Sequence, residues 1–306
     1  MNSKKFLKWL TLPLALVLTM SLVATGCSNG DDPAPTTTGP APLTGTLDII
    51  GSNTVTPITS QWAEEFMKLH KQVNIIVSGP GSSAGIAALI NKTTTFAQSS
   101  RAIKQSEIDQ AKAVGVNVVE TIVAVDALSI VVHPSNPVSS LTIQQLSDIY
   151  TGKVTNWNQV GGNNAPIVLL SRDTNSGTYG YFLEEVVQLL LIGKQDKTLN
   201  FSPSAQLLPS TSTGITEVSK NVNAIFFAGL GYLDSSVKAV PIKKTATDAA
   251  VSPSIATAKN GTYPIARNLY YYTAGQPEGL AKAFIEYALS TAGQKIVEEL
   301  GFVAVK

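Results

Sequence analysis

The feature that most constrains this 306-residue chain is a pattern that occurs three times: an apolar strand, a short turn rich in hydroxyl groups, and then a helix. The clearest copy is residues 171–179, reading SRDTNSGTY, which follow an apolar run and precede apolar residues at helical spacing. Alternation of this kind predicts an α/β fold with a parallel or mixed sheet that helices cover on both faces.

The turn at 171–179 has the composition of a helix start that binds an anion. Ser176, Gly177 and Thr178 fall where the first backbone N–H groups of a helix have no partner inside the helix. The helix dipole favours negative charge there, and Gly177 lets an oxyanion approach the backbone. Arg172 can add a charge-assisted contact of roughly 1.5 to 3 kcal/mol. Taken alone, the same residues also fit a serine cap and a surface arginine.

Two further copies of the pattern strengthen the prediction of an anion site. Residues 78–85, reading SGPGSSAG, precede a helix that we expect to begin near Ile86. Residues 51–57, reading GSNTVTP, precede a helix with one apolar stripe. Ligands of open α/β sheets bind beyond the carboxyl ends of the strands, where all three turns lie. The three turns are therefore expected to converge on one small anion.

As an ordered set, these motifs resemble those of the bacterial phosphate-binding proteins that serve ABC phosphate importers. The resemblance covers nearly the whole mature chain and includes four further motifs: FAQSSRAIKQSEI, LSDIYTGKVTNWNQVGG, AIFFAGLGYL and YALSTAGQKIVEELGFVAV. It implies a two-lobed fold of the periplasmic-binding-protein-like type II class with two hinge crossings. It also implies extracytoplasmic binding of inorganic phosphate without a cofactor, and delivery of the phosphate to the membrane permease subunits of an importer.

The expected phosphate contacts come from both lobes. The first lobe is expected to contribute Asn53, Thr54, Ser82, Ser83 and Ser100, and the second Arg172, Ser176, Gly177 and Thr178.

The chain departs from the family at two positions of the expected site. One branch of the family has an aspartate where this chain has Ser100, and that carboxylate is understood to accept a proton from bound hydrogen phosphate. Asp126 lies inside the apolar run 122–132, where a carboxylate without a donor is costly. We therefore expect Asp126 to take the ligand's proton, which disfavours sulfate because sulfate carries no proton at neutral pH. A structural carboxylate that caps a neighbouring backbone is the alternative.

The second departure is Thr174, which stands where relatives often have an acidic residue that braces the arginine. Asp173 is adjacent, but a step of one residue turns its side chain to a different side of the turn. The sequence therefore leaves open how Arg172 is held.

The amino terminus reads as an export signal. Residues 1–26 combine three lysines with an apolar run at 10–23 that is too short to span a bilayer comfortably. The segment ends in a sequence that resembles a bacterial lipobox, with Ala24 in place of the usual leucine. Cys27 is the only cysteine, and lipidation there leaves no free thiol on an exported protein. A signal peptide that happens to contain a cysteine is the alternative.

The domain boundaries follow from composition and from the apolar runs. Residues 27–43 are rich in proline and threonine and are expected to form a flexible, lipid-anchored linker. Lobe I is expected at 44–130 and 236–306, and lobe II at 131–235, with the second crossing near a strand at 237–242. We expect a monomer on the periplasmic or cell-surface side of the membrane, tethered at Cys27.

Several other classes of function lack support. The net charge of +1 gives no electrostatic case for nucleic acid. Neither His70 nor His133 has a partner at metal-ligand spacing, so no metal site is expected. No phosphate-binding loop of the G-x-x-x-x-G-K-[ST] type and no G-x-S-x-G nucleophile motif occurs, and an enzyme is not expected. A receptor for sulfate or molybdate, a secreted phosphatase and a lipid-anchored sensor or adhesin remain as alternatives.

Overall fold

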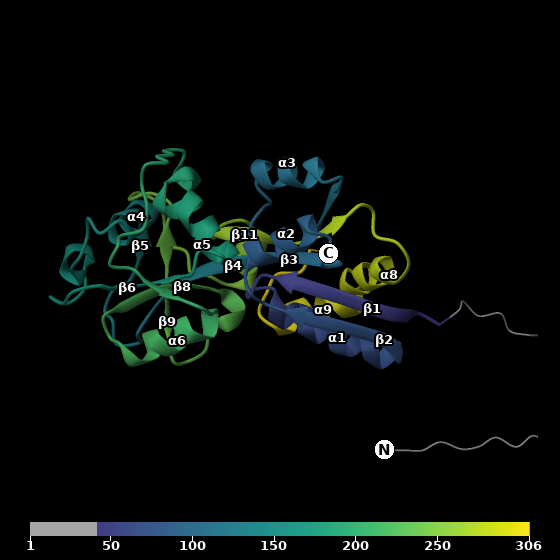
Figure 1. The fold of residues 1–306 in the computed structure, drawn as a ribbon. Helices are drawn as coiled ribbons and strands as arrows, with labels where there is room; N and C mark the ends of the chain where they lie inside the picture. Colours follow the sequence, from purple (N-terminus) through teal and green to yellow (C-terminus); the bar gives the residue numbers. More distant parts are fainter. Residues whose placement is uncertain (1–41, 306) are drawn as a thin grey trace, which may run out of the picture. The chain divides into compact units, whose positions relative to one another are not determined.

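A computed structural model describes residues 42–305 of the chain (Figure 1). The expectations for the signal peptide, for lipidation at Cys27 and for the linker as far as residue 41 lie outside these residues. Within the described part, no helix combines the length and the apolar character that crossing a membrane requires.

Strands and helices alternate along the described residues. The strands are β1 (Thr44–Gly51), β2 (Gln72–Ser78), β3 (Phe96–Ser99), β4 (Val118–Val132), β5 (Leu141–Thr142), β6 (Val168–Arg172), β7 (Gln206–Leu208), β8 (Ala224–Gly229), β9 (Lys238–Val240), β10 (Ile242–Lys243) and β11 (Ala266–Ala274). The α-helices are α1 (Thr56–Leu69), α2 (Ser82–Ile90), α3 (Gln105–Ala113), α4 (Ile143–Tyr150), α5 (Gly177–Phe182), α6 (Thr211–Lys220), α7 (Ile255–Lys259), α8 (Gly279–Ala288) and α9 (Thr291–Glu299). A π-helical turn, η2 (Leu183–Val187), continues α5.

One mixed sheet of nine strands runs through the described residues. Its order is β2-β1-β3-β11-β4-β8-β6-β7, and β9 pairs with β4 beside this path. Strand β1 is parallel to β2 and β3, and β6 is parallel to β7 and β8. The central strands β11 and β4 are antiparallel. The alternating strands and helices predicted from the sequence therefore form the expected mixed α/β architecture.

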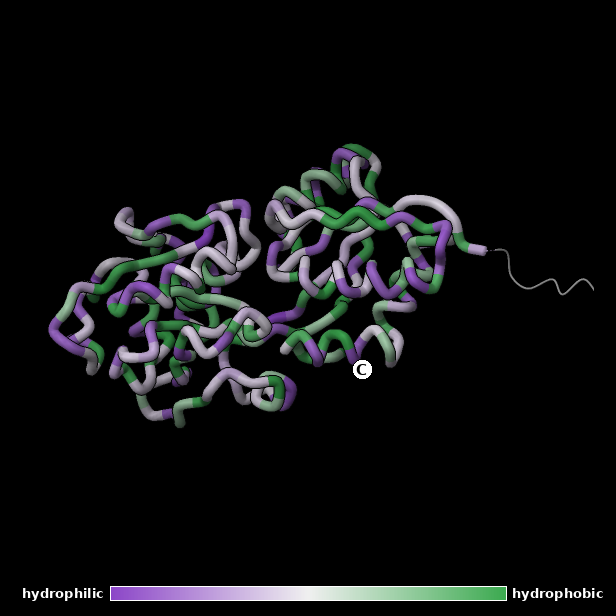
Figure 2. The backbone as a smooth tube through the Cα atoms, turned by 90° about the horizontal axis from the view of Figure 1, so that it is seen from below, coloured by the Kyte–Doolittle hydropathy of each residue, from purple (hydrophilic) through white to green (hydrophobic). Residues whose placement is uncertain are grey.

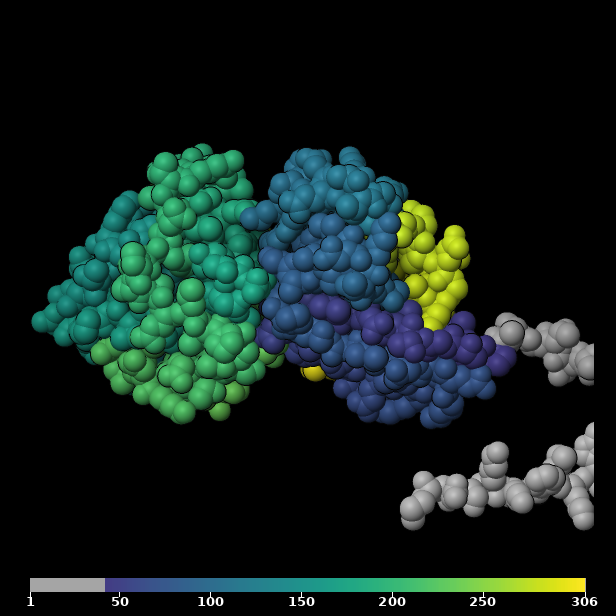
Figure 3. Space-filling model, in the orientation of Figure 1, coloured from purple at the N-terminus to yellow at the C-terminus, as the bar shows by residue number. Residues whose placement is uncertain are grey.

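Strand β4 joins two separately packed halves. Its residues 118–127 pair with β11, and its residues 128–132 pair with β8. Residues 42–125 and 266–305, which we call the first half, pack around an apolar core with Trp62 and Phe96. Residues 126–265, the second half, pack around Tyr150 and Phe227. Figures 1 and 2 show the two halves from two directions with a narrow junction between them, and Figure 3 shows a groove between them on the face drawn.

The chain returns to the first half later than expected. Val240, Ile242 and Ile265 all belong to the core of the second half. Strand β9 is three residues long, pairs with residues 130–132 of β4, and is followed by Pro241. Because proline has no N–H for a strand ladder, the predicted strand at 237–242 is interrupted there and cannot form the second crossing. The expectation of a crossing at 237–242 is wrong, and β11, which begins at Ala266, makes the return.

Helix α2 also begins earlier than expected, at Ser82 instead of near Ile86. Gly81 lies before it with φ of +119°, a conformation that side chains other than hydrogen rarely allow. The Gly81 N–H donates to the carbonyl of Gly51 at 2.7 Å, which ties this turn to the end of β1. The early start brings the Ser82 hydroxyl into the first turn of the helix.

Candidate functional site

Hydroxyl groups from the three turns and from the end of β3 meet at one buried place. Thr54 Oγ1 lies 3.0 Å from Thr178 Oγ1. Ser100 Oγ lies 3.4 Å from Thr178 Oγ1 and 3.5 Å from Ser82 Oγ. Each of these four side chains is at most 2 % exposed. We call them the hydroxyl cluster, and their proximity is the convergence of turns that the sequence predicted.

Glycine at position 177 allows the two halves to approach this closely. A β-carbon added to Gly177 would lie 2.1 Å from Ser82 Oγ and 2.8 Å from Ser100 Oγ, both far below contact distance. The Ser83 N–H also donates across the same boundary to the carbonyl of Asn175 at 3.1 Å. The turn before α5 and the start of α2 are therefore packed against each other without room for a side chain between them.

Three other predicted residues lie around the hydroxyl cluster with other partners. The Ser176 hydroxyl caps α5 and accepts from the Tyr179 N–H at 3.3 Å. The Ser83 hydroxyl accepts from Arg101 Nη2 at 3.2 Å. The Asn53 side chain accepts from the Thr211 N–H at 3.1 Å, so it connects the first half to the second.

Arg172 ends β6 and is 2 % exposed. Its Nη1 donates to Thr211 Oγ1 at 2.8 Å, and its other two nitrogens donate to the carbonyls of Leu208 and Pro209 at 3.3 and 3.0 Å. A guanidinium has five N–H donors, so these three contacts leave donors for an anion. Asp173 lies 3.7 Å from Nη2 and is a distant ionic neighbour. The Thr211 hydroxyl and two backbone carbonyls therefore hold this arginine.

The electrostatic surroundings of Arg172 place further polar groups near it. Burial lowers the pKa of Arg172, and the positive charge of Arg267 lowers it further. The neighbouring Asp173 and Tyr232 act in the opposite direction and raise this pKa. Burial also raises the pKa of Tyr232 to about 12, so the phenol is neutral and donates to the carbonyl of Asn53 at 2.7 Å. The positive charge of Arg267 is therefore part of the electrostatic environment of Arg172.

Asp126 is fully buried on β4 and has an ionic partner that the sequence analysis missed. Its Oδ2 accepts from Arg267 Nη2 at 2.9 Å and Nε at 3.2 Å, while its Oδ1 accepts from the Leu230 N–H at 3.1 Å. The backbone contact matches the alternative of a structural carboxylate. The same observation is compatible with an acceptor for a ligand's proton, because an ionised carboxylate offers about four lone pairs.

Arg267 connects Asp126 to the hydroxyl cluster. It is 5 % exposed, and its Nη2 donates to Thr178 Oγ1 at 3.0 Å as well as to Asp126. The signal that could have found it is the one that singled out Asp126: a lone charged residue in a run that is otherwise mostly apolar or aromatic, here residues 265–272.

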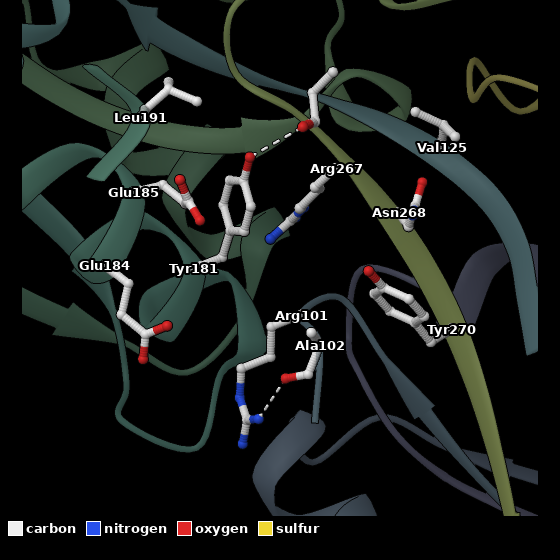
Figure 4. Close-up of a pocket in the computed structure, with 11 residues that line it drawn as sticks. Arg101, Ala102, Val125, Tyr181, Glu184, Glu185, Leu191, Arg267, Asn268 and Tyr270 are labelled. Carbon is white, nitrogen blue, oxygen red and sulfur yellow. Dashed lines mark hydrogen bonds between the residues drawn. The ribbon is translucent and has the colours of Figure 1, made fainter. Parts of the chain in front are cut away.

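A cavity of about 480 Å³ lies beside Arg267 at the junction of the two halves (Figure 4). Tyr181 and Glu185 line it from the second half, and Arg101 and Tyr270 from the first. The Tyr181 hydroxyl donates to the carbonyl of Ala266 at 3.0 Å, so the phenol is tied to the start of β11. Burial, together with the charge of Glu184, raises the pKa of Glu185. The wall next to Arg267 is therefore aromatic and acidic.

The comparisons with known proteins show the family of the chain. A family model described as a PBP superfamily domain matches residues 36–292. The chain belongs to the PBP superfamily. It is 34% identical over 278 residues to the phosphate-binding protein PstS of Pseudomonas aeruginosa, a match that covers 85% of this chain and 83% of the relative. It is 32% identical to the PstS protein of Borreliella burgdorferi, over 85% of this chain and 90% of the relative.

Solved structures give the same result. A proposed phosphate ABC transporter substrate-binding protein from Clostridium perfringens, solved with bound phosphate, superposes with a TM-score of 0.75 at 32% identity and covers 86% of this chain and 100% of its own. A phosphate transport receptor from Vibrio cholerae gives 0.67 at 31% identity, over 84% of this chain and 99% of its own. The resemblance to bacterial phosphate-binding proteins and the periplasmic-binding-protein-like fold predicted from the sequence are confirmed.

Proposed function

We propose that this PBP superfamily member binds inorganic phosphate outside the cytoplasmic membrane and delivers it to the permease of an ABC phosphate importer. The observation that carries the proposal is the buried hydroxyl cluster, Thr54, Ser82, Ser100 and Thr178. The buried Arg172 is linked to it through Thr211, whose N–H donates to Asn53, the residue before Thr54. Hydroxyl donors with a guanidinium suit a small tetrahedral oxyanion. The names of the relatives, and the bound phosphate in one structural neighbour, support phosphate as the ion.

The proposed phosphate contacts are the residues predicted from the sequence, and the hydrogen bonds of each residue suggest its role. Gly177 and Thr178 offer backbone N–H groups at the start of α5, and Arg172 offers the donors that Thr211 and the carbonyls leave free. Ser176 caps α5, and Asn53 accepts from Thr211, which in turn holds Arg172. Ser83 accepts from Arg101, and we propose all three residues as further contacts of the ligand. Asp126 accepts the proton of hydrogen phosphate, while Arg267 pairs with its Oδ2.

We further propose that the two halves are the lobes of a hinged receptor. Residues 42–125 and 266–305 form one lobe and residues 126–265 the other, joined through β4 and the start of β11. Hydrogen bonds across the boundary, such as Thr54 to Thr178 and Asn53 to Thr211, represent the closed arrangement. Closure around the ion removes water and strengthens each charge-assisted contact.

Titration calorimetry with phosphate and then sulfate tests the function. Micromolar affinity corresponds to about 8 kcal/mol, which one arginine and several hydroxyl and amide donors can supply in a closed site. Tight binding of phosphate with weak binding of sulfate supports the proposal. Preference for sulfate or molybdate would assign another oxyanion, and turnover of a chromogenic phosphate ester would assign a phosphatase.

The cellular placement is a proposal of its own, based on the sequence. We propose that the chain is exported, lipidated at Cys27 and tethered as a monomer by residues 27–43. Cell fractionation tests it: the protein should sediment with membranes, and the variant Cys27→Ser should be released into the soluble exported fraction. Membrane retention of that variant would exclude this anchor.

A further inference from the structure

Arg267 has a donor that the folded chain does not use. Its Nη1 atom is buried and has no hydrogen-bond partner, the only such side-chain atom found among residues 42–305. An unpaired buried donor of a charged group is costly, and native structures rarely retain one without a function. The position of this donor therefore calls for an acceptor that the chain itself does not supply.

The geometry of the guanidinium indicates where that acceptor lies. A guanidinium presents two donor edges, one formed by Nε and Nη2 and the other by Nη1 and Nη2. Asp126 Oδ2 occupies the first edge, with contacts to Nε at 3.2 Å and to Nη2 at 2.9 Å. Nη2 also reaches Thr178 Oγ1 at 3.0 Å. The second edge is thus next to the hydroxyl cluster and still has Nη1 free.

Neighbouring groups do not satisfy Nη1. The Tyr181 ring lies 5.3 Å from the Arg267 Cζ atom, a distance at which the ring face attracts the positive charge without accepting a conventional hydrogen bond. The Tyr181 hydroxyl donates to the carbonyl of Ala266, and its oxygen accepts no hydrogen bond from Nη1. Figure 4 shows Arg267 beside Tyr181 in this arrangement.

We propose that Arg267 is a second arginine of the anion site, and that its Nη1 donates to an oxygen of the bound oxyanion. The inference rests on the proposed function. Arg172 approaches the ion from β6 and Arg267 from β11, so each half contributes one guanidinium. Asp126 orients Arg267 by accepting from its Nε and Nη2 atoms. Because Asp126 lies on β4 and Arg267 on β11, the pair connects the bound ion to the two strands that join the halves.

A purely structural role for Arg267 makes a different prediction, and a double variant separates the two. If Arg267 only neutralises Asp126, the double variant D126N/R267Q should bind phosphate as tightly as the single variant D126N. If Arg267 binds the ion, the double variant D126N/R267Q lacks a ligand contact and stays weaker than D126N alone.

The experiment is titration calorimetry of inorganic phosphate into the wild-type protein, D126N, R267Q and D126N/R267Q. We expect the double variant to bind phosphate at least tenfold more weakly than D126N. A difference below fivefold would overturn the assignment, and a difference of fivefold or more supports it. Lys295→Gln removes one positive charge from an exposed site on α9 and serves as the control for net charge.

Two further measurements keep the test decisive. Melting temperatures without phosphate show whether each variant is folded, and R267K decides the question if the glutamine variants are not. Lysine keeps the charge but lacks the second donor edge, so R267K should lose at least fivefold in affinity. Wild-type affinity in R267K would overturn the proposal. If the wild-type protein itself does not bind phosphate, the proposed function fails, which is a result distinct from failure of the Arg267 assignment.

Discussion

Thr54 and Thr178 are 124 positions apart in the chain and come from different halves, yet their hydroxyl oxygens lie 3.0 Å from each other. Thr54 follows β1, and Thr178 lies in the first turn of α5. Their contact is the shortest link between the two strand-to-helix turns. The proposed site is therefore complete only when the turn at 51–57 packs against the turn at 171–179. Variants of the residues that permit this packing test the proposal.

Gly177→Ala should impair closure of the two halves on phosphate. The added β-carbon would lie 2.1 Å from Ser82 Oγ, so the start of α5 has to move away from α2. We expect phosphate affinity by calorimetry to fall at least tenfold. We also expect the decrease in radius of gyration on adding phosphate, measured by small-angle X-ray scattering, to be lost.

Gly180→Ala provides the matched control for this variant. It lies three residues further along the same helix, and its β-carbon would meet Arg101 Cδ at 3.3 Å, a contact that a flexible side chain can relieve. Affinity within about threefold of wild type is expected. Equal affinities for the variants at 177 and 180 would contradict the importance of the approach to Ser82.

Arg172→Ala should weaken phosphate binding at least tenfold. The guanidinium is 2 % exposed and keeps donors beyond those given to Thr211 and the two carbonyls. Losing one charge-assisted contact of roughly 1.5 to 3 kcal/mol corresponds to a tenfold or larger change in the dissociation constant. The melting temperature without phosphate should be measured in parallel, because Arg172 also holds the segment before α6. Undiminished affinity would place the anion elsewhere.

The strand-to-helix turns could be predicted from the sequence because their signals are local. An apolar run, a cluster of glycine and hydroxyl residues and a periodic helix identify each turn without knowledge of the rest of the chain. Their convergence then follows from a general property of α/β sheets. Thr54, Ser82 and Thr178 were therefore found from these local signals, and Ser100 from the resemblance to the family, although their role as ligands is a proposal.

The partners of the buried charges could not be predicted in the same way. Arg267 and Asp126 are 141 residues apart, and their pairing depends on the register of two antiparallel strands. Two of the three groups that hold Arg172 are the carbonyls of Leu208 and Pro209, and a backbone carbonyl has no signature in the sequence. The return at Ala266 was missed because the strand expected at 237–242 is interrupted at Pro241.

Asp126→Asn should narrow the preference for phosphate over sulfate. The carboxylate is fully buried, so an unprotonated sulfate oxygen beside it would meet repulsion in a poorly screened environment. An amide removes this repulsion and donates to sulfate. Competition calorimetry with both anions should show a gain in relative sulfate affinity. Unchanged selectivity would remove Asp126 from the discrimination and leave it as the counter-ion of Arg267.

Glu107→Gln should destabilise the protein near neutral pH and have less effect in acid. Arg101 donates to both Glu107 oxygens, at 2.6 and 2.8 Å, with side-chain exposures of 7% and 17%. Burial alone would raise the pKa of Glu107, but the hydrogen bonds from Arg101 and the Lys104 N–H outweigh it and lower the pKa below its usual 4.5. A lowered pKa in the folded state gives stability that is present above the unfolded pKa and is lost as pH falls through the folded value.

Urea unfolding of Glu107→Gln at pH 7 should show a loss of about 1 to 3 kcal/mol in the free energy of unfolding, and this loss should shrink below pH 4. The control is Glu286→Gln, in an exposed pair with Lys282, which should change the free energy of unfolding by less than about 0.5 kcal/mol. A loss that is equal at both pH values would mean that packing, and not the ion pair, accounts for the effect.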